Sequence, residues 1–564
     1  MRYLVLATDY DGTLADQGRV SEKILNELKA LKASGRRLIL VTGREMKDLM
    51  EVFPDYKIVD YIVAENGALI HEPATGKEQL LGPAPDESFV QALVDRGVRP
   101  LSVGKVIIAT WEPHEKTVLD VIKASGSERQ VIFNKGAVMI LPPGVNKATG
   151  LQKLLHSLHL SLHNVAAVGD AENDGALLQA SECAVAVANA LPGLKSLADW
   201  VTGAGHGLGV SQLIRALLAT DLCELDNKLT RHYLHLGELE DGSPFHISPY
   251  RKGILLAGAS GSGKTTFTLS IIEGMVQQGY QFCLIDPEGD YLQLPGAVVI
   301  GNDQALPSIE EIAHLLQEPG QNVVVCTLAI PLADRPDFFA RFLSMFLDLR
   351  KEYGHPHWLL LDEAHHLVPG QAETLADRLP EQFNNFIIIS TSPHALSTTS
   401  LSRVSTVIAI GKDSAYPFQQ FCELLQLPMP SNIPSLSENE IAVWDRESSA
   451  SVYKARFHLP EQLQQRHKKK YAQGDMSYNS FIFTGPENKM QLKANNLMLF
   501  VHISEGIDAE TWLFHLHRKD FSRWFRGAVH DEELAGVAEE AEKISDTGAS
   551  KKHILSYITT KYTG

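Results

Sequence analysis

Short apolar runs alternate with amphipathic stretches over the first 220 residues of the chain. Residues 3–7, 37–42 and 165–168 have the length and apolar composition of buried strands. Helical spacing begins near Ser21, whose hydroxyl can cap a helix start, and stops near Gly35. This alternation of strands and helices predicts an α/β domain, a parallel sheet with helices on both faces.

The alternation is interrupted between residues 80 and 146. Short strands are expected at 105–110 and 137–141, with a helix near 115–124 between them. This change of pattern predicts a small α+β module inserted into the first domain. The sheet pattern then resumes, and we place the end of the first domain near residue 222.

A second alternating region extends from residue 223 to 455. It begins with a polar stretch at 224–249 that predicts a hairpin. Five apolar runs then predict strands at 253–257, 281–285, 322–328, 358–361 and 386–390. The pattern predicts a second α/β domain.

The last part of the chain differs in composition. Residues 456–476 are charged and include a basic run at 464–470, which we interpret as a solvated linker rather than a nucleic-acid patch. Residues 477–564 are rich in Trp, Phe and His and predict a small, mainly helical domain. Its expected elements are a strand and turn at 481–489 and helical segments at 495–506 and 508–526. A regulatory or docking role is our hypothesis for this domain.

Composition narrows the class of protein. A length of 564 residues suggests roughly three to four domains. The formal net charge of -17 argues against a mainly electrostatic nucleic-acid binder. The five cysteines are scattered without a C-x-x-C pair, which indicates reduced thiols. No apolar run approaches the roughly 18 residues that span a bilayer, and the N-terminus enters a strand directly. We therefore expect a cytoplasmic protein with no signal peptide and no membrane contact.

The first candidate site begins directly after the first predicted strand. Asp9 and Asp11 follow that strand, and the i, i+2 spacing predicts that both carboxylates point to the same side. One carboxylate can attack a phosphorus atom and form an aspartyl-phosphate. The other can protonate the leaving oxygen and later activate water. This pair predicts phosphoryl-transfer chemistry.

Cations are needed where negative charge develops. Asp170 and Asp174, after the strand at 165–168, can complete a Mg²⁺ site with Asp9, because this metal prefers oxygen ligands. Lys147 supplies a further positive charge near the phosphoryl oxygens. Thr42, at the tip of the second strand, can donate a hydrogen bond to them.

Four motifs occur in one order, each at a strand end or a helix start: Asp9-Tyr10-Asp11-Gly12-Thr13, Val41-Thr42-Gly43-Arg44, Asn146-Lys147 and Gly169-Asp170-Ala171-Glu172-Asn173-Asp174. Together they resemble the motifs of the haloacid-dehalogenase-like (HAD) phosphatases over about residues 1–220. Glu65-Asn66-Gly67-Ala68 and the position of the inserted module resemble subclass IIB, which has a type-II cap. That subclass includes Cof-like, sucrose-phosphatase-like and phosphoglycolate-phosphatase-like enzymes.

The resemblance implies a role for each motif residue. Asp9 would be the nucleophile and Asp11 the acid and base, while Thr42 and Lys147 would bind phosphate. The implied Mg²⁺ ligands are Asp9, Asp11, Asp170 and Asp174, and the implied substrate-binding residues are Gly43, Arg44, Asn66 and Asn173. The cap residues Trp111, Glu112 and His114 could touch the leaving group, although packing within the module is the commoner role for such residues.

The second candidate site is a glycine loop between a strand and a helix. Residues 258–265 have the pattern G-x-x-x-x-G-K-T, in which backbone N–H groups can face phosphates. Lys264 would reach the β and γ phosphates and Thr265 would ligate Mg²⁺. Asp362 is placed for the outer shell of the metal and Glu363 for orienting the attacking water. The expected ATP-binding residues are Gly258, Ser260, Gly261, Ser262, Gly263, Lys264, Thr265 and Thr266.

Residues 235–455 resemble the HerA/FtsK-type P-loop ATPases. The resemblance rests on the glycine loop, on residues 284–291 from Leu284 to Tyr291, and on residues 361–365 from Leu361 to His365. In that family a strand resembling 387–391 usually ends in a glutamine that senses the γ-phosphate, but Ser392 stands here. This departure weakens the expectation that hydrolysis is coupled to movement.

Two further residue pairs in this region have open roles. Arg341 and Arg403 are candidates for an arginine finger, with surface salt bridging as the alternative. The adjacent His365 and His366 are expected to cap or pack rather than to bind a metal.

Three interpretations remain open at this point. The complete aspartate set favours a Mg²⁺-dependent phosphatase of a small phosphorylated metabolite, such as a sugar phosphate or phosphoglycolate. In that interpretation an ATP-binding or ATP-hydrolysing domain regulates or assembles the phosphatase. The alternatives are a HerA-like translocase on nucleic acid with an accessory HAD domain, and a nucleotide-sensing scaffold. Family analogy also implies a homo-oligomer, a hexamer.

Overall fold

The computed structural model of the chain describes residues 1–370, 384–460, 480–486, 489–494, 496–527, 529, 531–544 and 546–563. The chain divides into two compact units. The first comprises residues 1–457 apart from Thr265–Ser270, and the second comprises His458–Gly564 together with that short segment. Most of the predicted linker, including the basic run at 464–470, lies outside the described residues.

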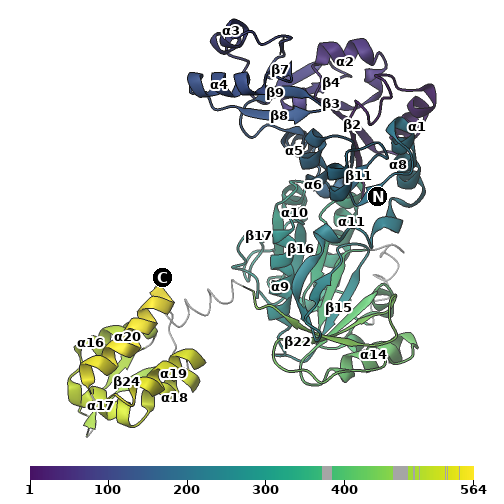
Figure 1. The fold of residues 1–564 in the computed structure, drawn as a ribbon. Coiled ribbons are helices and arrows are strands. Elements are labelled where there is room, and N and C mark those ends of the chain that lie inside the picture. The colour runs from purple at the N-terminus through teal and green to yellow at the C-terminus, as the bar shows by residue number, and fades with distance from the viewer. Residues whose placement is uncertain are drawn as a thin grey trace. The chain divides into compact units, whose positions relative to one another are not determined.

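An eight-stranded sheet occupies the first part of the first unit (Figure 1). Its strand order is β12-β11-β10-β1-β2-β3-β4-β5, and β1 pairs in parallel with both β2 and β10. The predicted parallel sheet is therefore confirmed, with an antiparallel extension at β4 and β5. The strands are β1 (Val5–Thr8), β2 (Arg37–Val41), β3 (Tyr61–Ala64), β4 (Leu69–Glu72), β5 (Lys77–Leu80), β10 (Val165–Gly169), β11 (Cys183–Ala186) and β12 (Trp200–Val201).

The helices that pack on this sheet have amphipathic sequences. Helix α1 (Glu22–Ala33) buries Ile24, Leu28 and Leu31 against the sheet core. Ser21 stands at its N-cap position, but the predicted hydroxyl cap is wrong, because the side chain makes no capping hydrogen bond. The other helices are α2 (Met46–Val52), α5 (Lys147–Ser157), α6 (Gly175–Ala180), α7 (Pro192–Leu197) and α8 (His206–Thr220).

The predicted α+β insertion is present as a four-stranded antiparallel sheet with its own apolar core. The strand order is β6-β7-β9-β8, and two helices pack on the sheet. The strand expected at 105–110 begins only at Ile108, because the preceding three backbone N–H groups donate to the carboxylate of Glu65. The elements are α3 (Glu87–Asp95), β6 (Ser102–Val103), β7 (Ile108–Trp111), α4 (Glu115–Ser125), β8 (Gln130–Asn134) and β9 (Ala137–Leu141).

An eleven-stranded sheet forms the rest of the first unit, in the order β14-β13-β23-β22-β21-β15-β20-β19-β16-β18-β17. The strands from β21 to β17 are parallel, and the others extend the sheet in antiparallel fashion. The predicted hairpin is the pair β13 and β14. The strands are β13 (Leu234–Leu239), β14 (Pro244–Ile247), β15 (Gly253–Ala257), β16 (Phe282–Asp286), β17 (Ala297–Ile300), β18 (Asn322–Cys326), β19 (Trp358–Leu361), β20 (Phe386–Ser390), β21 (Thr406–Ile410), β22 (Glu440–Asp445) and β23 (Tyr453–Phe457).

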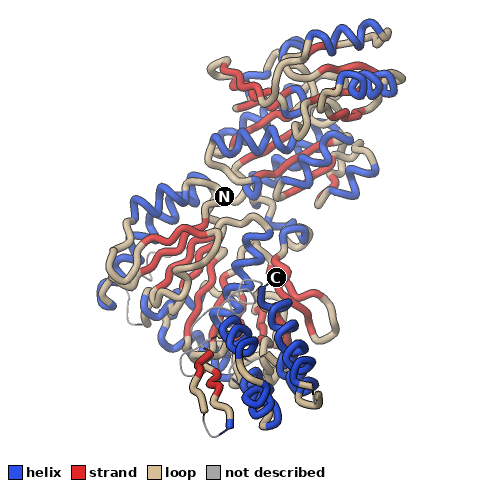
Figure 2. The backbone as a smooth tube through the Cα atoms, turned by 90° about the vertical axis from the view of Figure 1, so that its left-hand side faces the viewer, coloured by secondary structure: helices blue, strands red, loops and turns tan. Residues whose placement is uncertain are grey.

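Helices cover the second sheet as they cover the first, so that strands (red) lie between helices (blue) in Figure 2. Helix α11 buries Phe339, Phe342 and Phe346 in the same core as strand residues such as Leu255 and Leu359. The helices are α9 (Lys264–Gln277), α10 (Ile309–Leu316), α11 (Arg335–Tyr353), α13 (Thr398–Ser402) and α14 (Ala415–Leu425).

The described part of the second unit is mainly helical and is organised around aromatic side chains. Trp512 is fully buried beside Phe521, with ring centroids 4.5 Å apart. The helical segment expected at 508–526 is two helices, separated where Lys519 adopts a φ of 59°. The elements are β24 (Phe481–Phe483), β25 (Leu492–Ala494), α16 (Leu497–Gly506), α17 (Ala509–His517), α18 (Asp520–Gly527), α19 (Glu532–Ala541) and α20 (Thr547–Thr563).

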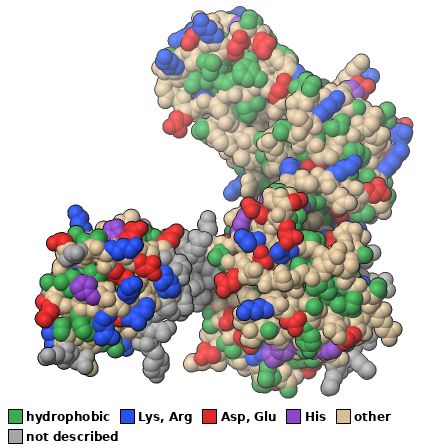
Figure 3. All heavy atoms as spheres, turned by 60° about the horizontal axis from the view of Figure 1, so that its bottom comes forward, with side chains coloured by type: hydrophobic (Ala, Val, Ile, Leu, Met, Phe, Trp, Pro, Cys, Tyr) green, Lys and Arg blue, Asp and Glu red, His purple; other side chains and the backbone are tan. Residues whose placement is uncertain are grey.

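Three further observations concern membrane-spanning helices, the cysteines and the charges on the surface. Among the described helices, none has both the length and the apolar character needed to cross a membrane. The five cysteines are free, as the sequence predicts. On the face in Figure 3, basic and acidic side chains are interspersed rather than gathered by sign.

Candidate functional site

Three buried carboxylates meet at the carboxyl edge of the first sheet. Strands β1 and β10 are neighbours in register, with Thr8 opposite Val168, so Asp9 and Asp170 follow paired strand ends. Asp174 lies in the short helical turn after β10. One carboxylate oxygen from each of these three aspartates lies within 4.8 Å of the others. The structure thus brings together the acidic residues predicted after β1 and β10.

Lys147 lies within this carboxylate cluster. Its Nζ is 2.5 Å from Oδ1 of Asp9 and 2.6 Å from Oδ1 of Asp174. Burial favours the neutral amine, but the two carboxylates outweigh it and raise the pKa of Lys147 above its usual range. Burial also raises the pKa of Asp9, and the lysine opposes this shift. Lys147 is the first residue of α5, whose start is fixed by a capping box at Asn146.

The remaining carboxylate oxygens are held by hydrogen bonds. Oδ2 of Asp174 accepts the backbone N–H groups of Asp170 at 2.9 Å and Ala171 at 3.0 Å. Oδ1 of Asp170 accepts the hydroxyl of Thr13 at 3.1 Å. These bonds fix the orientation of both carboxylates.

The cap contributes a cation that the sequence did not predict. Nζ of Lys135 lies 2.6 Å from Oδ2 of Asp170. Lys135 and Gly136 form the two-residue loop between β8 and β9, and both have positive φ, 49° and 87°. This is the geometry of a type I′ turn. A Lys-Gly pair between two short strands predicts such a turn, but it does not predict that the lysine reaches Asp170. Burial raises the pKa of Asp170, and Lys135 opposes the shift.

Asp11 does not join the carboxylate cluster. Its two oxygens accept from Arg44 instead, at 2.6 Å from Nε and 2.7 Å from Nη2. Strand β1 ends at Thr8, so the strand alternation that predicted parallel carboxylates at positions 9 and 11 does not apply. The structure therefore does not bring Asp11 into the predicted Mg²⁺ ligand set. Tyr10, between the two aspartates, is buried in the core of the first sheet.

The other predicted phosphate and substrate residues lie close together. Oγ1 of Thr42 accepts the backbone N–H of Arg44 at 3.1 Å. Oδ1 of Asn66 accepts Nδ2 of Asn173 at 2.9 Å, and both side chains lie beside Gly43. Nδ2 of Asn66 in turn contacts the sulfur of Met139 in β9, which joins this group to the cap.

The three predicted cap candidates are not placed at the carboxylates. Trp111 and Glu112 are exposed. His114 contacts the backbone carbonyl of Arg99 within the cap. The contact of His114 favours packing within the module, whereas Trp111 and Glu112 lie beside Gly136, the residue that follows Lys135.

The carboxylate cluster fits a hard divalent cation. Its donors are carboxylate oxygens, which Mg²⁺ prefers. Residue 12 leaves room at the site, because a Cβ added to Gly12 would lie 2.3 Å from Oδ2 of Asp170 and 2.8 Å from Nζ of Lys135. Asp9, Asp170 and Asp174 are therefore the residues that would hold the ion.

Comparison with known proteins agrees with this geometry. Residues 6–96 and 98–214 match the haloacid dehalogenase-like hydrolase family. A phosphoglycolate phosphatase of Methanothermobacter thermautotrophicus is 30% identical over 223 residues, which cover 38% of this chain and 98% of that protein. The chain belongs to the haloacid dehalogenase-like hydrolases. The predicted HAD phosphatase resemblance is thus confirmed for the N-terminal region.

One further relative and one solved structure match a similar share of this hydrolase. Phosphoglycolate phosphatase 2 of Saccharolobus solfataricus is 31% identical over 226 residues, covering 38% of this chain and 93% of that protein. A solved haloacid dehalogenase-like hydrolase from Bacillus subtilis is 21% identical, with a TM-score of 0.32, and covers 38% of this chain and 99% of that chain.

The glycine loop of this hydrolase lies at the carboxyl edge of the second sheet, after β15. Gly261 and Gly263 have φ values of 72° and 102°, which side chains other than glycine rarely adopt. Nζ of Lys264 donates to the backbone oxygens of Gly258 at 3.1 Å and Ala259 at 3.3 Å. Ser260 and Ser262 lie between these residues, and Thr265 and Thr266 lie in the first turn of α9.

Acidic residues end two strands at the same edge. Asp362 follows β19, and burial raises its pKa to about 7, with Glu363 adding to the shift. Glu363 has a φ of 35°, and its carboxylate lies 3.8 Å from Nζ of Lys264. Asp286, at the end of β16, accepts four backbone N–H groups of the following loop. The structure therefore brings Asp362 and Glu363 to the edge that carries the loop.

Ser392, which stands where the ATPase family usually has a glutamine that senses the γ-phosphate, bonds to a buried side chain. Oγ of Ser392 donates to Oε1 of Gln420 in α14 at 2.9 Å. Arg403 lies at the opposite end of β15, where its backbone oxygen faces Gly253, and Arg341 lines a groove with Glu310 and Asp337. The rings of His365 and His366 pack 4.1 Å apart.

Proposed function

We propose that the N-terminal region is a Mg²⁺-dependent phosphomonoesterase that acts on a small phosphorylated metabolite. The observation that carries this proposal is the buried cluster of Asp9, Asp170 and Asp174, in which Lys147 pairs with Asp9 and Asp174 and the cap residue Lys135 pairs with Asp170. A site that holds several carboxylates and cations out of water can stabilise charge as it moves during phosphoryl transfer.

In the proposed reaction Asp9 is the nucleophile. Its carboxylate oxygen forms a bond to phosphorus as the bond from phosphorus to the leaving oxygen breaks, and Asp11 donates a proton to that oxygen. Asp11 then takes a proton from water, whose oxygen attacks phosphorus and releases phosphate. Asp9 is restored as a carboxylate. Arg44 holds Asp11 by two hydrogen bonds and so orients it.

The remaining residues would bind and neutralise the phosphoryl group. Bound Mg²⁺ would supply Lewis-acid stabilisation of phosphoryl oxygens, held by Asp9, Asp170 and Asp174. Lys147 and the hydroxyl of Thr42 would bind the same oxygens. Gly43, Arg44, Asn66 and Asn173 would line the substrate.

The cap favours a leaving group that is small and anionic. Lys135 extends from the cap to the carboxylate cluster, and Arg44 lies on the core side. Both cations are paired with carboxylates of the protein, and a substrate with a second negative or strongly polar group could share these pairings. Relatives named phosphoglycolate phosphatase make phosphoglycolate the first candidate, with sugar phosphates next.

The test is phosphate release from a panel of phosphorylated metabolites, with and without Mg²⁺. Asp9→Asn should lower the rate by about 10⁴-fold or more, because the nucleophile is lost. The matched control is Asp16→Asn, an exposed aspartate in the same loop, which should keep the wild-type rate. Equal activity of Asp9→Asn and wild type on every metabolite would refute the proposal.

We further propose that residues 223–455 form a P-loop domain that binds ATP with Mg²⁺ and regulates or assembles the phosphatase. The supporting observation is the positive-φ glycine loop beside Lys264, with Asp362 and Glu363 at the same sheet edge. Gly258 to Thr266 would hold the phosphates, and Thr265 and Asp362 would serve the metal. Glu363 would orient water if ATP is hydrolysed.

Nucleotide binding can be tested apart from the phosphatase. Lys264→Ala should weaken Mg²⁺·ATP binding about 100-fold, since a charged phosphate contact is lost, and should leave phosphate release without ATP unchanged. Lys351→Ala, an exposed lysine in the last turn of α11, is the control. ATP binding by Lys264→Ala at wild-type affinity would contradict this site.

The domain boundaries, the location, the oligomeric state and the partners of the protein are part of the same proposal. The domain division is residues 1–222, 223–455, a linker at 456–476 and a C-terminal domain at 477–564. A cytoplasmic location agrees with five free cysteines. Homo-oligomerisation, as a hexamer by analogy, is measurable by light scattering with and without ATP. Nucleic acid is a disfavoured partner, because the chain carries a net charge of -17.

A further inference from the structure

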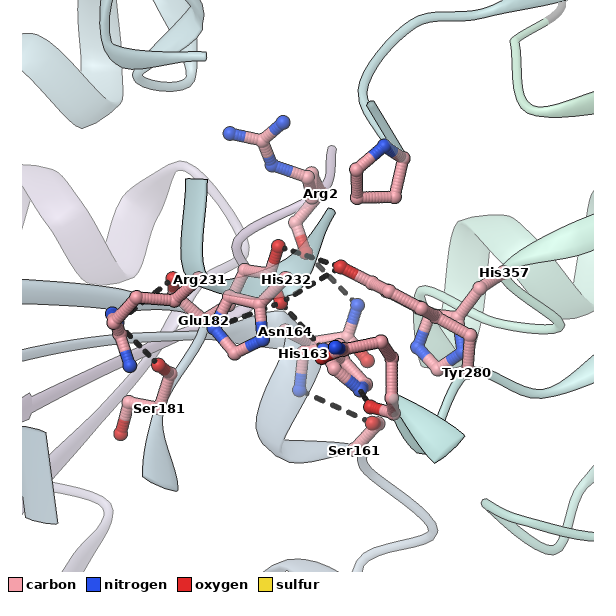
Figure 4. A network of polar contacts seen from close by, with 12 residues as sticks. Arg2, Ser161, His163, Asn164, Ser181, Glu182, Arg231, His232, Tyr280 and His357 are labelled. Carbon is pink, nitrogen blue, oxygen red and sulfur yellow. Dashed lines mark hydrogen bonds and ion pairs between the residues drawn. The ribbon is translucent and has the colours of Figure 1, made fainter. Parts of the chain in front are cut away.

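A second cluster of ligand-type side chains lies away from both candidate sites, where the first sheet meets the second. Glu182, which precedes β11, lies between His163, His232 and Tyr280 (Figure 4). His163 belongs to the short helical turn Leu162–Asn164, and His232 to the turn Thr230–His232 that leads into β13. Tyr280 lies between α9 and β16. The cluster therefore joins segments from both sheets of the first unit.

The contacts of Glu182 converge on one carboxylate. Nδ1 of His163 is 2.5 Å from Oε2, and Nε2 of His232 is 3.9 Å from the same oxygen. The hydroxyl of Tyr280 donates to Oε1 at 3.1 Å, and its ring stacks on His163 at 3.9 Å. One ligand atom from each of Glu182, His163 and His232 lies within 4.8 Å of the others.

The nearby arginines do not neutralise this carboxylate directly. Arg2 pairs with Asp226 at 2.8 Å, and Arg231 pairs with Asp199 at 2.7 Å. Burial works against ionisation of Glu182, yet its contact with His163 and the nearby charge of Arg2 outweigh burial and hold its pKa well below the usual range. A buried ionised carboxylate needs a close positive charge. The two imidazoles or a bound cation can supply it.

The hydrogen bond on the far side of His163 determines which ring nitrogen faces Glu182 with a proton to spare or a lone pair. Nε2 of His163 lies 3.0 Å from the backbone oxygen of Gln278, which can only accept, so Nε2 carries a proton. In the neutral ring, Nδ1 then presents a lone pair to Glu182. A lone pair 2.5 Å from a carboxylate oxygen is repulsive, so this contact requires a positive charge at Nδ1, either a second proton or a metal ion. Imidazoles that bind metals commonly donate their other N–H to a carbonyl in this way.

His232 provides independent evidence that this cluster can bind a ligand. Its side chain is buried, and Nε2 has no hydrogen-bond partner among the residues that the structure describes. Burial lowers the pKa of His232, which favours the neutral ring with an available lone pair. An unpaired buried nitrogen is costly, and a metal ion would satisfy it.

An ion can reach the cluster from solvent. A cavity of about 370 Å³ is lined by His163, His232, Gln278 and Gly279, with His156 and Ser161 on its wall. The cavity has room for water as a further ligand. Access and an open position complete the requirements of a bound transition-metal ion.

We propose that His163, Glu182 and His232 bind one zinc ion, with water from the cavity as the fourth ligand. Two imidazoles and a carboxylate suit Zn²⁺ better than Mg²⁺, because imidazole is a borderline ligand and Mg²⁺ takes oxygen. Tyr280 keeps its proton and holds Glu182 by a hydrogen bond. The ion would tie the first sheet to the turn that starts the second, which makes it a structural clamp within the first unit.

The experiment measures zinc bound to the full chain. Protein stripped with a chelator is given Zn²⁺, with excess Mg²⁺ to fill the carboxylate cluster, and bound metal is counted after dialysis. Wild type should keep about one zinc per chain. His232→Gln should lose it, with affinity weakened by at least about 100-fold. His156→Gln, on the wall of the same cavity but outside the cluster, should keep zinc, and so should Asp170→Asn.

A second readout does not depend on a variant that folds poorly. Co²⁺ bound to wild type in place of zinc should give the visible absorption of an imidazole-ligated ion, and Zn²⁺ should raise the melting temperature. Both effects should be absent in His232→Gln, while its melting temperature in chelator should match that of wild type. Wild type without stoichiometric zinc, or an unchanged Co²⁺ spectrum in His232→Gln, would overturn the proposal in favour of a protonated His163–Glu182 pair.

Discussion

Asp9 and Asp362 occupy equivalent places in two sheets but have opposite electrostatic surroundings. Each follows a central parallel strand, and burial raises the pKa of each. Nζ of Lys147 lies 2.5 Å from Asp9. The charged groups that act on Asp362 are Glu363, Asp286 and Asp290, and all of these are acidic.

The difference indicates how each site depends on its ligand. The first site carries its own counter-charges, from Lys147 within the cluster and Lys135 on the cap. At the second, Lys264 bonds to its own loop and lies 3.8 Å from Glu363, so negative charge is in excess around Asp362. We infer that the first site keeps its geometry without ligand, whereas the second is stabilised by a cation that arrives with nucleotide.

The strongest test of this comparison removes Lys147. In Lys147→Met, Asp9 and Asp174 lose their shared cation while staying buried, so unfolding should become easier by about 3–5 kcal/mol. The loss should be larger at pH 8 than at pH 5, because protonation relieves two facing carboxylates. Phosphate release should fall about 10³-fold. Urea unfolding in chelator measures the first effect, and the metabolite assay measures the second.

The control for this variant is Lys153→Met, an exposed lysine on the same helix, α5. It should change neither stability nor rate. If Lys147→Met unfolded at the wild-type urea concentration at both pH values, the first site would not depend on its own counter-charge.

Sequence alone predicted the buried strands well, for a physical reason. Parallel strands covered on both faces are continuous apolar runs, so β15, β19 and β20 begin and end at the predicted residues. The antiparallel strands β22 and β23 carry polar side chains among apolar ones and were not predicted. Apolar continuity does not find every buried strand, because β3, β11 and β21 are also parallel and buried and were not predicted.

The carboxylate site shows which residue positions cannot be predicted from local sequence patterns. Motif order identified the residues that follow β1 and β10, because sheet register brings strand ends together. Strand alternation misplaced the carboxylate of Asp11, because the strand had already ended at Thr8. Lys135 was missed because its role depends on how the cap hairpin lies over the core. A contact between residues so far apart in the sequence cannot be predicted from residue spacing.

A smaller effect is expected at Asp362. Its pKa is about 7 in the folded protein against 3.8 for an aspartate in the unfolded chain, so between these values the unfolded chain binds fewer protons and stability falls as pH rises. At pH 8 the penalty reaches at most about 4 kcal/mol. Without metal and nucleotide, Asp362→Asn should therefore be more stable than wild type at pH 8, and the gap should close toward pH 4.

Mg²⁺ with ATP should narrow the same gap at pH 8 by stabilising wild type. The control is Asp348→Asn, an exposed aspartate on α11. Urea unfolding across pH measures all three proteins. A difference between Asp362→Asn and wild type that does not vary with pH would show that desolvation of this carboxylate is not its cause.

The smallest expected effect tests whether Lys135 in the cap has a different role from the buried Lys147. Lys135 is 46% exposed at its side chain, so solvent screens its pair with the buried Asp170, and Lys135→Met should lower the melting temperature much less than Lys147→Met does. If Lys135 binds the anionic part of the substrate, KM should rise about 10–100-fold with a smaller change in kcat, because binding is lost more than chemistry. Lys123→Met, an exposed lysine on the cap helix α4, should behave as wild type. A fall in kcat with KM unchanged would instead place Lys135 in transition-state stabilisation, and the counter-charge of this site would then extend from the core into the cap.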